Sequence, residues 1–324
     1  MTDIHVPIPF LAFDGKAYYP AVRTRVMHNH LNGNFKHYLL ENNMPERLKA
    51  LKTGLDRKSQ AAIDRNLSYI LNYPDAGSLF AKACFCRNEE VFLTPPEVKD
   101  LHSKHRKWCA LQKSGISGDY PTALFEHGLK ELPKSVLDYI AGKTFVDAGA
   151  YDGSSALVFK KYKPSKIYSF EISPVNLEKL RQNTANDRDL IDIIPMALFS
   201  HKTLLSFRDT GDATNSVFRP GEEKVETISL DAFWETKASS ETLGLLKADT
   251  EGAEMEILAG ARKQITRDRP LLSLSIYHNP KQFFEMKPYL ESWDLGYKFF
   301  IRRYNPRPIL DETTLIAYPK ELDE

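Results

Sequence analysis

The chain has 324 residues, of which 42% are hydrophobic and 27% are charged, and its formal net charge is +1. This composition is typical of a globular protein with two domains, or with one domain and a large extension. A net charge so close to zero creates no overall field that would attract nucleic acid or an acidic membrane. We therefore expect neither of these partners.

No segment approaches the roughly 18 consecutive apolar residues that a membrane-spanning helix needs. Residues 1–10 lack the basic segment and long apolar core of a signal peptide. Three cysteines are too few, and odd in number, for a disulfide framework. We therefore expect a cytoplasmic protein without a membrane span.

Residues 1–142 are predicted to form a mainly helical region. Between residues 31 and 71, apolar side chains recur at steps of three and four, and Pro45 suits the first turn of a helix. Pro95-Pro96 suits the start of another helix. We expect this region to act as a cap, to help bind a substrate, or to form the contacts of a homo-oligomer.

Several side chains of the zinc-binding type also lie in this first region. They are Cys84, Cys86, His102, His105 and Cys109. The cysteine spacing of structural zinc sites is absent, and free cysteines are often simply small buried residues. We therefore predict no zinc site here.

Residues 143–324 alternate between strand-like and helix-like segments, which predicts an α/β domain with a mostly parallel sheet. The predicted strands are 144–146, 166–170, 191–194, 245–248, 271–276, 297–301 and 313–318, and the predicted helices are 154–161, 175–183 and 254–264. Segments 204–208 and 225–230 are typical of an inserted hairpin. The last two strands are joined by a turn too short for a crossover helix, so they should be antiparallel.

A glycine turn follows the first of these strands and is the first candidate site. Its glycines allow the backbone to turn tightly and to approach a ligand closely, as in nucleotide-type cofactor loops. The spacing is G-x-x-x-G, not the dinucleotide pattern G-x-G-x-x-G. The predicted cofactor-binding residues of this turn are Asp147, Ala148, Gly149, Ala150, Asp152, Gly153 and Ser154.

A carboxylate, Glu171, ends the second strand about 20 residues after the glycine turn. An acid at this offset can accept both ribose hydroxyls of a nucleoside. Strand ends also carry solvated carboxylates without any such role. The combination with the glycine turn favours a cofactor site.

The charges around the turn distinguish two cofactors. A dinucleotide needs a helix N-terminus that is free to bind its pyrophosphate. Asp147 and Asp152 flank the turn, and they would repel that group. They would attract the sulfonium and ammonium groups of S-adenosylmethionine, so this cofactor is the one that we predict.

Three more carboxylates cluster where the fourth strand meets its helix, at the carboxyl edge of the sheet. Asp249 ends the strand and should point into the cleft, and Glu251 and Glu254 should share one face of the helix start. Glu256 is expected only to interact favourably with the helix dipole.

Tyr277 and His278 end the fifth strand at the same edge. Histidine is the side chain best suited to take a proton near neutral pH. An isolated histidine is usually just a satisfied polar group, but its position opposite Asp249 favours a catalytic role.

Together these motifs resemble the FkbM family of methyltransferases over about residues 142–319. The matching pieces are Val146–Ser154, Phe170–Pro174, Thr227–Asp231, Lys247–Glu254, Leu258–Ala261 and Ser275–His278. Ile172 stands where the family usually has proline directly after the ribose-binding acid. The resemblance implies a class I methyltransferase sheet whose last strand is antiparallel.

The resemblance also implies S-adenosylmethionine as cofactor, S-adenosylhomocysteine as product, and a carbohydrate or other small molecule as the hydroxyl acceptor. Asp147, Gly149 and Gly153 would line the methionine part, Glu171 with Ile172 the ribose, and Ala197-Leu198 the adenine. Residues 120–129 are similar to a segment that such enzymes place before the first strand, and we expect it to close over the cofactor.

In-line methyl transfer depends on positioning and desolvation, and an alcohol also needs a base for its proton. We predict that His278 or Asp249 is this base, that Glu251 and Glu254 orient hydroxyls, and that Asp249 also contacts the cofactor. Mg²⁺ is an alternative partner of these carboxylates, but we predict no metal. Two other functions stay open: an NAD-dependent sugar-modifying oxidoreductase, and a methyltransferase-like domain that binds a partner without turnover.

Overall fold

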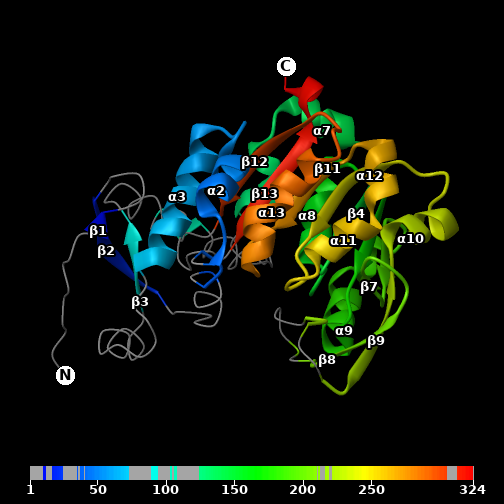
Figure 1. Ribbon diagram of the computed structural model, residues 1–324. Coiled ribbons are helices and arrows are strands. Elements are labelled where there is room, and N and C mark those ends of the chain that lie inside the picture. The colour runs from blue at the N-terminus through cyan, green and yellow to red at the C-terminus, as the bar shows by residue number, and fades with distance from the viewer. Residues whose placement is uncertain are drawn as a thin grey trace.

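Seven strands form one central sheet in the order β12-β13-β11-β10-β4-β5-β6 (Figure 1). The computed structural model describes residues 10–11, 17–24, 35, 37–39, 41–72, 89–93, 103, 106–107, 124–209, 211, 216–218, 221–304 and 312–323. The strands are β4 (Thr144–Ala148), β5 (Lys166–Phe170), β6 (Ile191–Ile194), β10 (Leu243–Ala248), β11 (Leu271–Ser275), β12 (Tyr297–Arg303) and β13 (Thr313–Pro319).

The pairing of these strands confirms the predicted fold class. β4 pairs in parallel with β5 and with β10, and β10 pairs in parallel with β11. β13 is antiparallel to both β11 and β12, as the short connection between the last two strands predicts. The carboxyl ends of β4, β5, β10 and β11 therefore meet at one edge of the sheet, where ligands bind in open α/β folds.

Helices cover both faces of the sheet, and the side chains of β4 show why. Phe145 belongs to a buried cluster with α7 (Lys134–Ile140) and α8 (Ser154–Phe159). Its neighbour Val146 belongs to a cluster on the opposite face, which includes α10 (Leu230–Lys237), α11 (Glu254–Gly260), α12 (Arg262–Asp268) and α13 (Pro280–Glu291). Successive strand side chains point to opposite faces, so every central strand is buried on both sides.

Four helices, α10 to α13, differ from the sequence-based prediction. Segment 254–264 was expected as one helix, but α11 ends at Gly260 and α12 begins at Arg262. α10 and α13 were not predicted, although each begins at a capping residue. The side chain of Ser229 accepts a hydrogen bond from the Ala232 N–H, and that of Asn279 accepts one from the Gln282 N–H.

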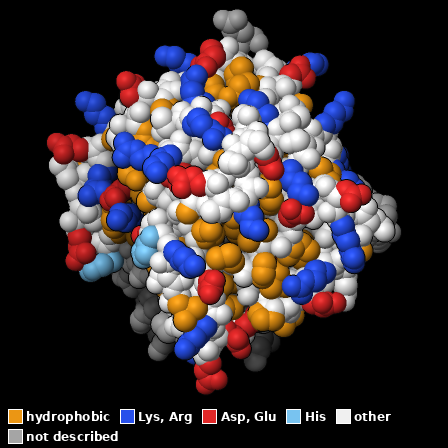
Figure 2. All heavy atoms as spheres, turned by 90° about the vertical axis from the view of Figure 1, so that its right-hand side faces the viewer, with side chains coloured by type: hydrophobic (Ala, Val, Ile, Leu, Met, Phe, Trp, Pro, Cys, Tyr) orange, Lys and Arg blue, Asp and Glu red, His pale blue; other side chains and the backbone are white. Residues whose placement is uncertain are grey.

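The inserted hairpin is present as part of a small sheet in the order β7-β9-β8. β8 (Leu204–Phe207) and β9 (Glu223–Ile228) are antiparallel, as predicted, and β9 also pairs in parallel with β7 (Ala197–Leu198). α9 (Pro174–Asn183) lies beside this sheet. Figure 2 shows the face that carries these elements, where Lys and Arg side chains are interspersed with Asp and Glu around hydrophobic groups.

The N-terminal region contains helices and also a sheet that the sequence pattern did not predict. The helices are α2 (Met44–Lys52) and α3 (Arg57–Asn72), and the sheet consists of β1 (Phe10–Leu11), β2 (Ala17–Thr24) and β3 (Glu89–Leu93). The zinc-type residues Cys84, Cys86, His102, His105 and Cys109, the helix expected after Pro95, and residues 120–123 lie outside the described residues.

The helix α3 packs directly against the edge of the central sheet. Arg302 of β12 donates from Nη2 to Asp56 at 2.7 Å, and the hydroxyl of Ser59 accepts the Ile301 N–H at 2.9 Å. Ile63 and Leu67 of α3 are buried in the same cluster as α13. The described helices are all too short or too polar to cross a membrane.

Candidate functional site

The glycine turn begins at a buried charge pair. Asp147 is fully buried at the end of β4, and Lys247 lies beside it on β10 in the parallel register. The Lys247 ammonium lies 3.1 Å from Asp147 Oδ1 and donates to the carbonyl oxygen of Gly149 at 2.7 Å. Burial raises the pKa of Asp147, and Lys247 offsets part of this rise. Lys247 thus fixes the turn against β10.

Gly149 occupies a position that no other residue fits. Its φ is +77°, and a Cβ there would lie 1.9 Å from the carbonyl oxygen of Asp249. A φ of this sign is costly for residues with a Cβ. The glycine therefore lets the end of β4 and the end of β10 touch.

Two predicted residues of the turn contribute to its local structure. The Asp152 carboxylate accepts the backbone N–H of Ser154 at 3.0 Å, and the Asp152 carbonyl accepts a hydrogen bond from Asn183. Gly153 has φ +87° and packs against Leu180. These contacts hold the start of α8. Asp147 and Asp152 therefore both have partners inside the protein, which weakens the charge argument that we based on them.

Glu171 lies at the end of β5 and is 6% exposed. Its carboxylate accepts three backbone N–H groups, from Tyr151, Ile172 and Ser173, each at 2.8 Å. Burial raises the pKa of Glu171, and these three hydrogen bonds oppose the rise. The carboxylate is thereby held in one orientation beside the glycine turn.

A pocket that is open to solvent joins these groups. The predicted cofactor residues that line it are Ala148, Gly149, Glu171, Ile172, Ala197, Leu198 and Asp249. The predicted residues Asp147, Ala150, Asp152, Gly153 and Ser154 support its wall but do not line it. The pocket is also lined by residues that the sequence pattern did not predict, among them Tyr151, Asn176, Met196 and Val217.

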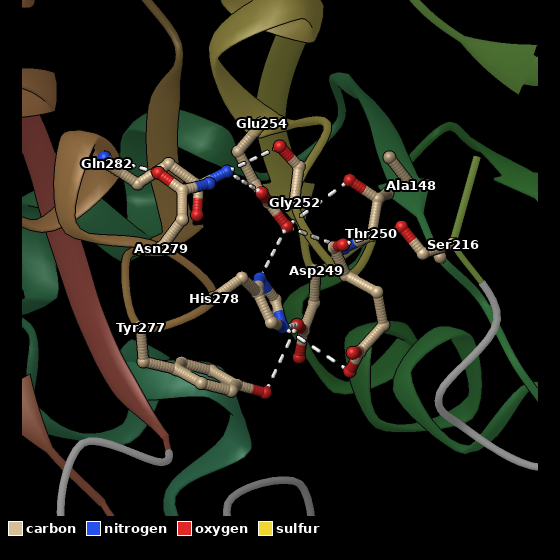
Figure 3. A network of polar contacts seen from close by, with 12 residues as sticks. Ala148, Ser216, Asp249, Thr250, Gly252, Glu254, Tyr277, His278, Asn279 and Gln282 are labelled. Atoms are coloured by element: carbon tan, nitrogen blue, oxygen red, sulfur yellow. Dashed lines mark hydrogen bonds and ion pairs between the residues drawn. The ribbon is translucent and has the colours of Figure 1, made fainter. Parts of the chain in front are cut away.

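His278 lies between three carboxylates, as Figure 3 shows. Its Nδ1 lies 3.0 Å from Glu254 Oε1. Its Nε2 lies 3.4 Å from Asp249 Oδ1 and 3.4 Å from Glu251 Oε1. The Tyr277 hydroxyl also reaches Asp249, at 3.4 Å. The residues predicted from the ends of β10 and β11 are therefore brought together, and Asp249 and Glu251 line the pocket.

Glu254 is fully buried and forms the rear of this cluster. Its Oε1 accepts the Thr250 N–H at 2.7 Å, and its Oε2 accepts the side-chain amide of Gln282. The same amide of Gln282, from α13, donates to the carbonyl of Gly252 at 2.7 Å. Gln282 was not predicted as a site residue. It holds Glu254 in contact with His278.

The charges of the cluster are coupled. Burial alone would lower the pKa of His278, but Glu254 and Glu251 outweigh it, and the pKa lies well above its ordinary value. Burial opposes ionisation of Glu254 too, yet His278 and the Thr250 N–H lower its pKa. A protonated imidazole with carboxylates on both sides is therefore the favoured state near neutral pH.

A short segment after β8 adds to the rim of the pocket. The hydroxyl of Ser216 donates to the carbonyl of Glu251 at 2.7 Å, and Glu251 has an unusual φ of 55°. Val217 lines the pocket. Phe218 is 55% exposed, and its ring lies 3.3 Å from the Cβ position of Gly252.

Asp249, Glu254 and His278 each offer a ligand atom to a metal, and these atoms lie within 4.8 Å of one another. Both oxygens of Glu254, however, already accept hydrogen bonds from Thr250 and Gln282. A metal bound to Glu254 would have to displace these buried donors, which is costly. The residues fit a hydrogen-bonded network better than a metal ion, and we keep the prediction that the site uses none.

The part of the chain that forms the pocket matches a known protein family. Residues 147–299 match the family described as the methyltransferase FkbM domain. This region of the chain is similar to the FkbM methyltransferase domain. The match confirms the resemblance found in the sequence, over somewhat fewer residues than the 142–319 inferred there. Every lining residue of the pocket, and each of Asp249, Glu254 and His278, lies within the matched residues.

Two relatives extend this comparison. The 2-O-methyltransferase NoeI of Sinorhizobium fredii (strain NBRC 101917 / NGR234) is 27% identical, over 38% of this chain and 59% of the relative. The crystal structure of methyltransferase FkbM from Methylobacillus flagellatus KT is 20% identical, with a TM-score of 0.57, over 88% of this chain and 61% of that chain. The chain thus spans about three fifths of each, and the structural match shows the fold.

The contact between Gly149 and Asp249 can be tested by adding one methyl group. Gly149→Ala should lower the melting temperature and abolish ligand binding, because the Cβ would overlap the Asp249 carbonyl. Gly142→Ala is the matched control, since Gly142 has φ +75° and open space around its Cβ position. The free energy of unfolding of the control should fall by only about 1–2 kcal/mol, the cost of a left-handed backbone. If urea denaturation shows equal losses of unfolding free energy in the two variants, the close contact of Gly149 with Asp249 is not the cause.

The His278–Glu254 pair predicts a specific dependence of stability on pH. The folded-state pKa of His278 is raised and that of Glu254 is lowered. The pair therefore stabilises fully between the ordinary values of 4.5 and 6.5. Its contribution declines as the pH rises from there through the raised pKa of His278, and as the pH falls through the lowered pKa of Glu254.

Glu254→Gln should accordingly cost about 3–5 kcal/mol within that pH window, because it leaves a buried charge without its partner. The loss should shrink as the pH is raised above it. Urea denaturation at a series of pH values measures the loss of stability and its dependence on pH. Glu256→Gln, on the same helix, is the control. A loss that is the same at every pH would show that the ion pair is not its cause.

Proposed function

We propose that the chain transfers the methyl group of S-adenosylmethionine to a hydroxyl group of a carbohydrate or a glycosylated metabolite. The observation that carries this proposal is the single pocket lined by Gly149, Glu171, Asp249 and Glu251. It joins the wall that would bind a nucleoside to the cluster of Asp249, Glu251, Glu254 and His278. A cofactor and an acceptor could therefore meet at the end of β10.

The pocket walls suit the parts of this cofactor. Glu171 offers carboxylate oxygens to the ribose hydroxyls, and Ile172, Ala197 and Leu198 offer an apolar surface to adenine. Asp249 and Glu251 supply negative charge for the sulfonium. The alternative function, an NAD-dependent oxidoreductase, is less favoured because these carboxylates would repel a pyrophosphate in the same pocket.

The proposed reaction is an in-line displacement. The acceptor oxygen forms a bond to the methyl carbon while the carbon–sulfur bond breaks, which leaves S-adenosylhomocysteine as a neutral thioether. The alcohol proton passes to the Asp249 carboxylate. His278, protonated near neutral pH, holds Asp249 and Glu251 in place, because its Nε2 lies 3.4 Å from each.

The rim of the pocket supports a carbohydrate acceptor. Carboxylates accept hydrogen bonds from vicinal hydroxyls, and an exposed aromatic ring such as Phe218 offers a flat apolar surface to a sugar. Phe218 lies directly over Gly252, next to Glu251. The relative NoeI is a 2-O-methyltransferase, which agrees with transfer to oxygen.

Cofactor binding is the first test of the proposal. Isothermal titration should detect binding of S-adenosylhomocysteine and no binding of NAD⁺. Glu171→Ala should weaken the binding of S-adenosylhomocysteine at least about tenfold, because two charge-assisted hydrogen bonds are lost. Glu178→Ala, an exposed residue on α9, is the control and should leave the affinity unchanged. Binding of NAD⁺ instead would reject the methyl donor.

Turnover is the second test, and it also separates an enzyme from a binding domain without activity. S-adenosylhomocysteine release should be measured with a panel of glycosides and nucleotide sugars. Asp249→Asn should lower kcat by about 10²–10⁴-fold, the usual range for general acid–base catalysis. The variant should still bind S-adenosylhomocysteine. Glu256→Gln is the control and should leave kcat unchanged. If kcat of Asp249→Asn is unchanged as well, Asp249 is not the base.

A further inference from the structure

Gln282 is a buried residue that contacts the cluster of His278 and its three carboxylates from behind. It lies in the first turn of α13, is 1% exposed, and is not one of the residues that line the pocket. A buried amide needs partners for its N–H groups, because an unpaired polar group inside a protein is costly. Both acceptors of the Gln282 amide belong to the segment that follows β10.

The first acceptor belongs to a turn with an unusual backbone. Glu251 has a φ of 55°, and Gly252 has a φ of 121°. The Ser216 hydroxyl donates to the Glu251 carbonyl at 2.7 Å, and the Gln282 amide donates to the Gly252 carbonyl at 2.7 Å, from opposite sides of the turn in Figure 3. A non-glycine residue with positive φ persists only where the surrounding structure holds it. Gln282 therefore helps to fix the turn that carries Glu251.

The second acceptor is the carboxylate of Glu254. The Nε2 of Gln282 donates to Glu254 Oε2, while the other oxygen of that carboxylate lies 3.0 Å from His278 Nδ1. A reversed amide would place its own oxygen against two acceptors, the carboxylate and the Gly252 carbonyl, so the observed orientation is the stable one. One side chain thus holds both the turn and the rear carboxylate of the cluster.

The helix that carries Gln282 is itself anchored at two places. The side chain of Asn279 accepts the backbone N–H of Gln282 at 3.0 Å and so caps α13. One turn further on, Tyr38 donates to Glu285 at 2.6 Å, and Arg47 forms an ion pair with the same carboxylate. Tyr38 and Arg47 belong to the N-terminal region, which therefore supports the site through α13.

We propose that Gln282 is a positioning residue, which holds Glu254 against His278 and thereby fixes the carboxylates that face the pocket. This inference rests on the proposed function, because it assigns a role in the same site to a residue outside the pocket. His278 lies 3.4 Å from Asp249, the proposed base. A displaced Glu254 would therefore disturb the base through the imidazole, and a misplacement of about 1 Å can lower a rate about 100-fold.

Gln282→Met is the first test, since methionine keeps an unbranched, flexible side chain and removes the amide. S-adenosylhomocysteine release should show a kcat that is about 10–100-fold lower. Calorimetry should show unchanged affinity for S-adenosylhomocysteine, because Gln282 does not line the pocket. Gln264→Met on α12 is the matched control, since Gln264 is also buried and donates to a carboxylate, that of Asp268. The control should leave kcat unchanged.

Gln282→Glu keeps the shape of the side chain and changes its hydrogen bonding. The introduced carboxylate would repel Glu254 and the Gly252 carbonyl, but in its protonated form it donates one hydrogen bond. The ratio of its kcat to that of the unchanged protein should therefore rise as the pH is lowered. A side chain that merely fills space would give a ratio that does not depend on pH.

The titration of His278 provides a readout that needs no turnover. Burial lowers the pKa of His278, but Glu254 and Glu251 raise it well above its ordinary value. An opposite charge at such a distance shifts a pKa by about 1–3 units. Nitrogen NMR of the imidazole should therefore show a pKa about one unit lower in Gln282→Met, where Glu254 is no longer held in place. The titration should be unchanged in Gln264→Met.

Three results would overturn the inference. They are an unchanged titration of His278 in Gln282→Met, an equal shift in Gln264→Met, and a kcat of Gln282→Met within about twofold of the unchanged protein. Failure of the proposed function is seen differently, because the unchanged protein would then bind no S-adenosylhomocysteine. Failure of the inference alone leaves that binding intact and is seen in the variants.

Discussion

The site depends on one buried cation, Lys247. A lysine that is 3% exposed must recover the free energy of its lost hydration from partners inside the protein. It does so by pairing with Asp147 and by donating to the Gly149 carbonyl. These contacts join the end of β4 to β10. They bring the cofactor wall and the carboxylate cluster close enough to share one pocket.

Charge balance explains the rest of the arrangement. Asp249, Glu251 and Glu254 would repel one another if they stood alone at the end of β10. His278 lies among them, and Gln282 and Thr250 donate to the rear carboxylate, so the group is stable and retains net negative charge. That charge faces the pocket, where the proposed cofactor carries its sulfonium.

The order of the elements and the main site residues could be predicted from sequence because they depend on local patterns. Glycines after a strand, an acid at the end of the next strand, and carboxylates with a histidine at two further strand ends all place their side chains at one sheet edge. α13 was not predicted, although Asn279-Pro280 combines a capping residue with proline in the first turn.

Other parts depend on contacts that no local pattern reveals. The pairing of Lys247 with Asp147 follows from strand register, and the contact of Gln282 with Glu254 follows from how α13 packs. The local role of Asp152 was likewise hidden, because an aspartate in a turn can face a ligand or a backbone N–H. The sheet formed by β1, β2 and β3 requires pairing between distant segments, which periodicity alone does not predict.

A crystal structure of the protein with S-adenosylhomocysteine tests the central claim most directly. The account predicts the ribose hydroxyls on Glu171, the adenine against Ala197 and Leu198, and the sulfur at the end of β10 facing Asp249. A ligand bound with its sulfur away from Asp249 and His278, or bound outside this pocket, would contradict it.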